Sequence, residues 1–282
     1  MNYKGINIFK LLTLTVLILA GVRGVSSAFT INPYYLVFEG RTRIQTFTVR
    51  NNGNEEKSYK VSLKHLKQTK SGGYEKIQDD ESQGVKFADD FLMYGPKSFS
   101  LQPKESKTIR IQSKHMTSDK PDGEYRSHLY VKETSKVKKA ISNKKAKEGT
   151  LSMTIGVDPG ISIPLVVRKG NLTGDVKISN FRIVKTEDGG SKLLLSLERT
   201  GDISFKGKLE VLKDDEVIAI QNGLAIYPEM GHISLEKELK DRKTKENISY
   251  ESLKGENITV VYTTEKRFNK KDISVEKSME IE

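Results

Sequence analysis

The chain has 282 residues, no cysteine and a formal net charge of +11 at pH 7. The absence of cysteine excludes disulfides and thiolate metal ligands, so packing alone must stabilise the fold. The positive charge favours acidic partners or anionic surfaces. It does not indicate nucleic acid, because the basic residues are spread along the chain among acidic ones, with only one dense cluster.

The first 28 residues are typical of a secretory signal. Lys4 and Lys10 supply a basic start, residues 11–22 form an apolar run, and Ser26-Ser27-Ala28 offers small residues for cleavage. The alternative is a membrane anchor, but the apolar run is shorter than the about 20 residues that cross a bilayer. We therefore expect an exported protein whose mature chain begins at Phe29.

From residue 29 to residue 170, short runs of alternating apolar residues are separated by turn sequences. The apolar faces are Phe47/Val49, Tyr59/Val61/Leu63, Ile109/Ile111 and Tyr125/Leu129/Val131. Asn51-Asn52-Gly53-Asn54, Ser71-Gly72-Gly73 and Asp122-Gly123 are typical of hairpin joints. No segment has an apolar stripe at helical spacing, so the alternating pattern of residues 29–170 predicts a β-sandwich.

A Lys-rich stretch, residues 132–150, precedes the most distinctive strand of the sequence. Its few apolar side chains predict a mobile loop. The sequence then alternates, with Leu151, Met153, Ile155 and Val157 on one side of an extended backbone. Such a strand can complete the core of its own domain or pair through its edge with another protein.

Pro159-Gly160 interrupts this stretch before the alternation continues to Val167. Proline cannot donate a ladder hydrogen bond and glycine permits a kink, so we expect the strand to bend there and change sheets. The alternative is that the break limits how much of the strand a partner can use.

The alternating pattern starts again after Lys169-Gly170. Its apolar faces are Val176/Ile178, Leu193/Leu195/Leu197, Leu209/Val211, Ile233/Leu235, Ile258/Val260/Tyr262 and Ile273/Val275. The spacing of strands and turns predicts an all-β chain of two successive sandwiches with about seven strands each. The expected organisation is a signal peptide over residues 1–28, a first domain over 29–170 and a second over 171–282.

Several segments of the expected first domain occur in a specific order and spacing. They are Pro33-Tyr34-Tyr35-Leu36-Val37-Phe38-Glu39-Gly40-Arg41, Phe47-Thr48-Val49-Arg50-Asn51, Leu101-Gln102-Pro103-Lys104-Glu105-Ser106-Lys107-Thr108-Ile109-Arg110-Ile111 and Gly123-Glu124-Tyr125-Arg126-Ser127-His128-Leu129. With Glu198-Arg199-Thr200-Gly201-Asp202 and Gly223-Leu224-Ala225-Ile226-Tyr227 in the second domain, the chain resembles a divergent periplasmic pilus chaperone of the chaperone–usher pathway. The resemblance implies two immunoglobulin-like domains in a boomerang arrangement and a periplasmic location.

In that family, the last strand of the first domain donates apolar residues to a pilus subunit whose own immunoglobulin fold lacks one strand. The resemblance assigns this donor role to Leu151, Met153, Ile155 and Val157. Each aliphatic side chain buried in this way contributes ~1.5–3 kcal/mol. The implied partners are secreted pilus-type subunits and an outer-membrane usher. The sequence does not decide whether the free protein forms a dimer in which each copy covers the exposed strand of the other.

Two positions depart from the family pattern. Members usually carry an arginine in the first strand and a lysine in the last strand, which together bind the terminal carboxylate of the subunit. The corresponding residues here are Tyr35 and Pro164, and neither is a cation. The alternatives are that Arg41, Arg43 or Arg168 substitutes, that the client is anchored differently, or that pilins are not the clients.

Another implied feature is a salt bridge between Glu124 and Arg168 that helps to hold the angle between the domains. The alternative is two ordinary surface charges, which contribute ~0–1 kcal/mol when exposed.

The sequence thus predicts a non-enzymatic chaperone for fimbrial biogenesis that works by donor strand complementation and needs no cofactor. No catalytic residue is predicted. The histidines lack metal-ligand spacing and the acidic clusters lack the pattern of a calcium loop, so no metal site is expected. The alternative function is an exported adhesion or structural β-sandwich module that binds acidic polymers or a membrane surface. A β-sandwich hydrolase would need a nucleophile and a base, and no such pair is recognisable.

Overall fold

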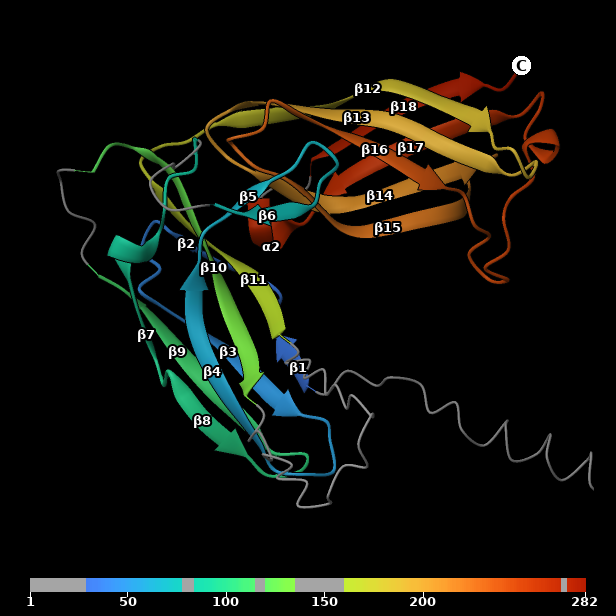
Figure 1. The fold of residues 1–282 in the computed structure, drawn as a ribbon. Helices are drawn as coiled ribbons and strands as arrows, with labels where there is room; N and C mark the ends of the chain where they lie inside the picture. Colours follow the sequence, from blue (N-terminus) through green and yellow to red (C-terminus); the bar gives the residue numbers. More distant parts are fainter. Residues whose placement is uncertain (1–28, 78–83, 115–119, 135–159, 270–272) are drawn as a thin grey trace, which may run out of the picture.

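A computed structural model describes residues 29–77, 84–114, 120–134, 160–269 and 273–282 (Figure 1). The expected signal peptide, residues 135–150 of the expected Lys-rich loop and the four expected donor residues, Leu151, Met153, Ile155 and Val157, lie outside these ranges. Residues 132–134 of the expected loop are instead the end of a strand, because they pair with residues 58–60. Within the described ranges, no helix has the length and apolar character to cross a membrane.

The first sandwich consists of two main sheets with the strand orders β1-β3-β9-β7 and β2-β11-β10-β4-β8. The strands are β1 (Phe29–Asn32), β2 (Leu36–Glu39), β3 (Ile44–Asn51), β4 (Lys57–Lys64), β7 (Leu92–Gly95), β8 (Ser98–Leu101), β9 (Ser106–Ser113), β10 (Gly123–Thr134) and β11 (Gly160–Lys169). The short hairpin of β5 (Leu66–Gln68) and β6 (Tyr74–Lys76) and the 3-10 turn η1 (Asp89–Phe91) complete this domain. Because β1 pairs with β3 and β2 pairs with β11, the chain crosses between the sheets from Asn32 to Leu36.

The second sandwich has sheets with the orders β12-β13-β16 and β15-β14-β17-β18. The strands are β12 (Gly174–Lys185), β13 (Ser191–Gly201), β14 (Phe205–Lys213), β15 (Glu216–Ile226), β16 (His232–Glu238), β17 (Asn257–Thr264) and β18 (Ser274–Glu280). A 3-10 turn, η2 (Tyr250–Ser252), and a single helical turn, α2 (Lys266–Asn269), lie in its connections. Gly170 lies between β11 and β12, where the chain passes from one sandwich to the other.

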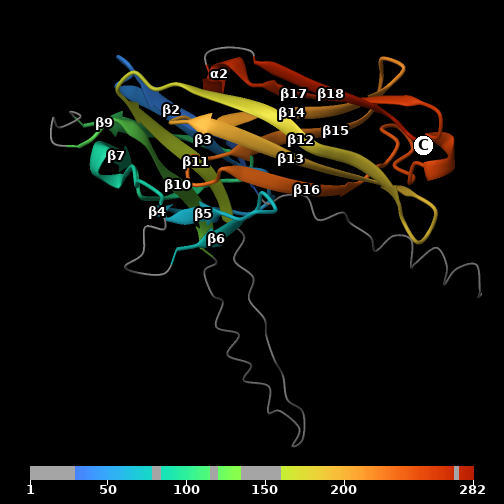
Figure 2. The ribbon, with the colours of Figure 1, turned by 90° about the horizontal axis from the view of Figure 1, so that it is seen from above.

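Each sandwich has its own apolar core, built from the alternating positions of facing strands. Phe47 and Val49 contribute to the first core, and Leu193 and Leu195 contribute to the second. The two sandwiches meet at an angle in Figure 1, and Figure 2 shows the second extending away from the first. The prediction of an all-β fold with two immunoglobulin-like sandwiches in a boomerang arrangement is therefore confirmed.

Candidate functional site: an open strand edge beside a rigid domain junction

Strand β11 is paired along one edge and only half paired along the other. It pairs with β10 along its whole length, from Gly160 opposite Lys132 to Lys169 opposite Gly123. On its other side, β2 pairs only with residues 165–168. Residues 160–164 therefore have β10 on one side and, within the described chain, no strand on the other. An open edge of this kind presents unpaired backbone groups that another strand can bind.

The described half of this strand fills the core of its own domain. Ile163, Leu165 and Val167 are buried there, and Ile161 is partly buried against them. The opposite face carries Ser162, Pro164, Val166 and Arg168. Residues 160–167 thus complete the core of their own domain. Strand donation by residues 151–157 stays a prediction.

Gly160 has a packing role at the start of β11. A β-carbon at this position would lie 2.2 Å from the Tyr130 hydroxyl, because Tyr130 lies across the glycine. The Tyr130 ring also contacts Lys64, whose ammonium lies 3.2 Å from the ring centroid. A cation–aromatic pair therefore borders the open edge.

Tyr35 and Pro164 are neighbours, because Leu36 and Leu165 are paired in the sheet. Tyr35 is nevertheless buried between the domains, where its ring meets Phe268 at 5.2 Å between centroids and the Lys206 ammonium at 4.6 Å. Burial, followed by hydrogen bonding to Glu265, raises the pKa of Tyr35 to about 12. The phenol of Tyr35 thus packs against the second domain. Pro164 lies opposite His128 and is partly exposed.

The three arginines considered as substitute anchors have different surroundings. Arg41 and Arg43 are exposed between β2 and β3, and neither guanidinium forms an ion pair with a described residue. Arg168 is 3% exposed and fully engaged, so it is not available to bind a client carboxylate. Arg41 and Arg43 remain predicted candidates only.

Arg168 and Glu124 form a buried ion pair at the junction of the domains. Arg168 Nε donates to Glu124 Oε2 at 3.0 Å, and the two side chains are 2% and 1% exposed. Arg168 Nη1 donates to the Phe268 carbonyl at 2.7 Å, and Glu124 Oε2 also accepts from the Ser204 backbone N–H at 3.0 Å. The second domain thus contributes backbone groups rather than an acidic side chain, and this hydrogen bonding compensates for the burial of both charges.

A second buried ion pair, which the sequence did not reveal, crosses the same junction. Arg126 Nη2 donates to Glu229 Oε1 at 2.5 Å, and the two side chains are 3% and 5% exposed. Arg126 also donates to the Leu66 carbonyl at 2.9 Å and lies 3.7 Å from the centroid of the Tyr227 ring. The only sequence signal was that Arg126 follows Glu124 on the same face of a predicted strand.

The β5–β6 hairpin extends from the first domain onto the second (Figure 1). The side-chain amide of Gln68 donates to the Ala225 carbonyl at 2.7 Å and accepts from the Tyr227 backbone N–H at 3.1 Å. The Lys70 carbonyl accepts from the Ser234 backbone N–H at 2.8 Å. The sequence indicated the hairpin turn but not this interdomain contact.

His128 lies beneath this hairpin. Its side chain packs edge-on against Tyr74, with 5.0 Å between ring centroids, and the residue is 2% exposed. Neither ring nitrogen has a hydrogen-bond partner among the described residues. Burial, followed by the charge of Arg126, lowers the pKa of His128 to about 3. His128 is thus buried, because the hairpin covers this part of the sheet.

Replacing Gln68 with leucine is expected to loosen the junction. The change keeps the side-chain bulk but leaves the Ala225 carbonyl and the Tyr227 N–H without their buried partner, at a cost of ~1–3 kcal/mol for each group. Hydrogen exchange should accelerate at the Tyr227 amide and stay unchanged at Val260, deep in the second core. Equal acceleration at both amides would contradict a local role for Gln68.

The described residues contain no group of three or more His, Asp or Glu side chains suited to hold a metal ion. No protein-family model matches the chain, and no curated protein matches it. Solved structures to which it is similar include the CupB2 chaperone of Pseudomonas aeruginosa, at 11% identity and a TM-score of 0.44 over 89% of this chain and 100% of that chain.

Two further similar structures are described as complexes of a chaperone with a subunit. One is the CsuC–CsuE pre-assembly complex from archaic chaperone–usher Csu pili of Acinetobacter baumannii, at 13% identity and a TM-score of 0.43 over 89% and 98% of the two chains. The other is the Salmonella enterica SafA pilin with the SafB chaperone, at 13% identity and a TM-score of 0.41 over 91% and 98%. At these identities, the functional residues must be argued from the geometry of this chain.

Proposed function

We propose that this protein is a periplasmic chaperone that binds secreted fimbrial subunits by donating an edge strand and delivers them to an outer-membrane usher. The proposal depends mainly on the open edge of β11 at residues 160–164. The alternating residues Leu151, Met153, Ile155 and Val157 come shortly before this edge in the chain. The family resemblance of the sequence supports the same function.

The physical basis is strand addition. A client strand that pairs with the open edge satisfies backbone donors and acceptors, while alternate apolar side chains of the donor fill pockets in the client. Because Tyr35 and Pro164 carry no positive charge, backbone pairing and apolar burial have to supply most of the affinity. No catalytic step or cofactor enters this mechanism.

The buried junction supports the proposal by holding the open edge in a constant relation to the second domain. The Arg126–Glu229 ion pair, the hydrogen bonds of Arg168 and Glu124 with Phe268 and Ser204, and the Gln68 contacts join the sandwiches. A preorganised surface loses less conformational entropy when a partner binds.

The test is a double substitution on the donor face, Ile155→Asp with Val157→Asp. Each lost aliphatic contact is worth ~1.5–3 kcal/mol, so affinity for a co-expressed fimbrial subunit should fall more than about 100-fold. Co-purification and isothermal titration of the subunit measure the loss, and the melting temperature checks that the variant is folded.

The matched control places the same charges on the other face of the stretch, with Ser152→Asp and Thr154→Asp. This control should bind the subunit as the unmodified chain does, including in 0.5 M salt. Persistent binding by the Ile155/Val157 variant would exclude strand donation. Loss of binding by every variant on raising the salt would instead favour the alternative module that binds acidic polymers.

A further inference from the structure

The second sandwich is open along one side, between the edge strands β15 and β16. In the described sheets, β16 pairs with β13 alone and β15 pairs with β14 alone. A cavity of about 630 Å³ lies between the two edges, lined by Ala219 and Ile220 of β15 and by residues 236–238 of β16. We refer to this opening as the β15–β16 groove.

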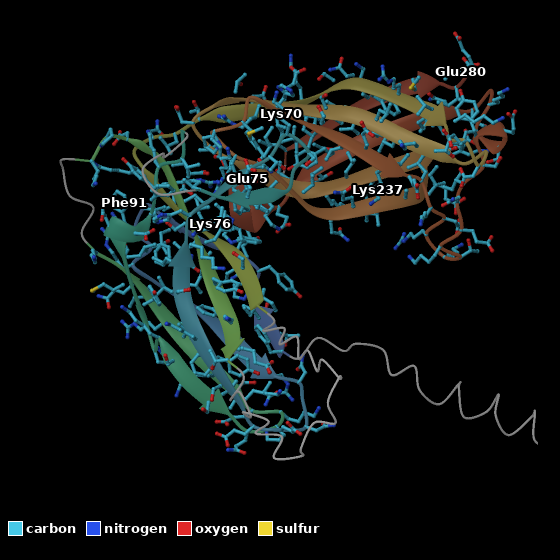
Figure 3. The ribbon with its side chains drawn as sticks, in the orientation of Figure 1. Lys70, Glu75, Lys76, Phe91, Lys237 and Glu280 are labelled. Atoms are coloured by element: carbon cyan, nitrogen blue, oxygen red, sulfur yellow. The ribbon has the colours of Figure 1, made fainter. Side chains whose placement is uncertain are left out.

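The chain's own hairpin occupies the end of this opening near the domain junction. The Lys70 carbonyl pairs with the Ser234 N–H on the edge of β16, while Gln68 bonds to Ala225 and Tyr227 at the end of β15. Figure 3 labels Lys70, on the hairpin, and Lys237, farther along the second sandwich. The turn of the hairpin thus reaches the edge of β16 and bonds to it through one backbone hydrogen bond.

Beyond the hairpin, the edge of β16 continues without a partner strand in the described chain. The Leu239 N–H bonds to the Ser191 carbonyl on the β13 side, whereas the Ser234 N–H points outward to Lys70. Backbone groups alternate in direction along a strand, so those of Glu236 and Glu238 also point outward. These groups continue the row of outward-pointing backbone groups on β16 that begins at Ser234, whose N–H bonds to Lys70.

Lys237 projects into the groove from the core-facing side of β16. Its neighbours on that side, Leu235 and Leu239, are buried, and its ammonium donates to the Ile220 carbonyl at 3.3 Å. Lys237 is half-buried and forms no ion pair with a described residue, and its burial lowers its pKa. A carboxylate at this place would stabilise the ammonium.

The other charges of the groove leave it positive. Lys192, Lys240, Arg242 and Lys245 lie around it together with three acidic residues. Among these acidic residues, Glu238 Oε2 lies 3.8 Å from the Lys240 ammonium. The Asp241 carboxylate accepts hydrogen bonds from the backbone N–H groups of Lys243 and Thr244.

We propose that the β15–β16 groove binds an extended segment of a partner protein by pairing with the edge of β16. The residues of that segment that face the groove are apolar, except for one carboxylate opposite Lys237. The residues on its other face are uncharged, because Glu236 and Glu238 are exposed beside them. This site is distinct from the edge of β11 and does not depend on its function.

A competing explanation is that Lys237 protects the edge. Inward-pointing charges on edge strands discourage pairing with other chains. The two explanations differ in whether a segment with a matching carboxylate binds.

The probe is the fluorescently labelled, end-capped peptide Thr-Val-Thr-Glu-Thr-Val-Thr, titrated into the full protein and followed by anisotropy. We expect saturable binding that weakens about tenfold in Lys237→Met, which keeps the side-chain stem and removes the charge. Lys277→Met, on the exposed edge strand β18, is the matched control and should leave the affinity unchanged. Hydrogen exchange with bound peptide should slow at the amides of Glu236 and Glu238 but not at Lys237.

Absence of binding would overturn the proposal and favour protection of the edge. Equal binding of a peptide with lysine in place of its glutamate would overturn it as well, and so would equal weakening by Lys277→Met. Sedimentation of the protein alone tests a second copy as the occupant. A dimer that Lys237→Met dissociates would also contradict the proposal.

Discussion

Replacing Arg168 with methionine is expected to lower the free energy of unfolding by ~3–5 kcal/mol, because the change leaves a buried carboxylate without its cation. Glu124 is 1% exposed, and its Oε1 has no hydrogen-bond partner in the described chain even with Arg168 present. Arg168 also bonds to carbonyls of Phe268 and Ser204 in the second domain. Urea denaturation followed by circular dichroism measures the loss.

Two controls separate the buried pair from a general effect of removing a cation. Lys185→Met removes an exposed partner of Glu251 and should change stability little, because water already screens that pair. Adding Glu124→Leu to Arg168→Met should recover a large part of the loss, because no buried charge then stays unpaired. A loss of the same size in the double variant would show that Arg168 acts through packing instead.

Acid should destabilise the protein through His128, and His128→Leu should remove this effect. Burial holds the pKa of His128 at about 3 in the folded chain, against 6.5 for the ordinary group. Between these values only the unfolded state binds the proton, so the folded state loses up to ~1.4 kcal/mol for each pH unit of acidification. At pH 4 the loss should reach ~3 kcal/mol relative to pH 7, and it should grow until about pH 3.

The measurement is the difference in unfolding free energy between pH 7 and pH 4 for the unmodified chain and for His128→Leu. We expect a smaller difference in the variant and no loss at pH 7, since the histidine nitrogens have no partners to lose. His232 is exposed, so His232→Leu should leave the difference unchanged. An unaltered difference in His128→Leu would assign the acid sensitivity to other groups.

The strands were predictable where alternation was regular and one face was buried. Phe47/Val49, Leu193/Leu195/Leu197 and Ile258/Val260/Tyr262 all lie in the expected cores. The first part of β15 was missed because its residues are only partly buried and its pairing with β14 is interrupted by register shifts. A strand at the edge of a sheet is not forced into strict alternation, so its pattern is weaker.

The candidate site was only partly predictable. The sequence named Glu124 and Arg168 as a pair, but their burial depends on backbone groups that Ser204 and Phe268 supply from the other domain. It also gave Tyr35 as the residue at a family anchor position, but not that the second domain covers this residue with Phe268. Contacts between residues far apart in the chain leave no periodic signal, so the Arg126–Glu229 pair was not expected.

The sequence by itself determined the all-β class, the succession of two sandwiches and the alternating apolar stretch of residues 151–157, because side-chain alternation is a local property of an extended chain. Only the tertiary structure decided which part of β11 has an open edge, which charges are buried at the junction, and that the turn of a first-domain hairpin bonds to the edge of β16. These features depend on which strands become neighbours, and that choice follows from the packing of whole sheets rather than from any single segment.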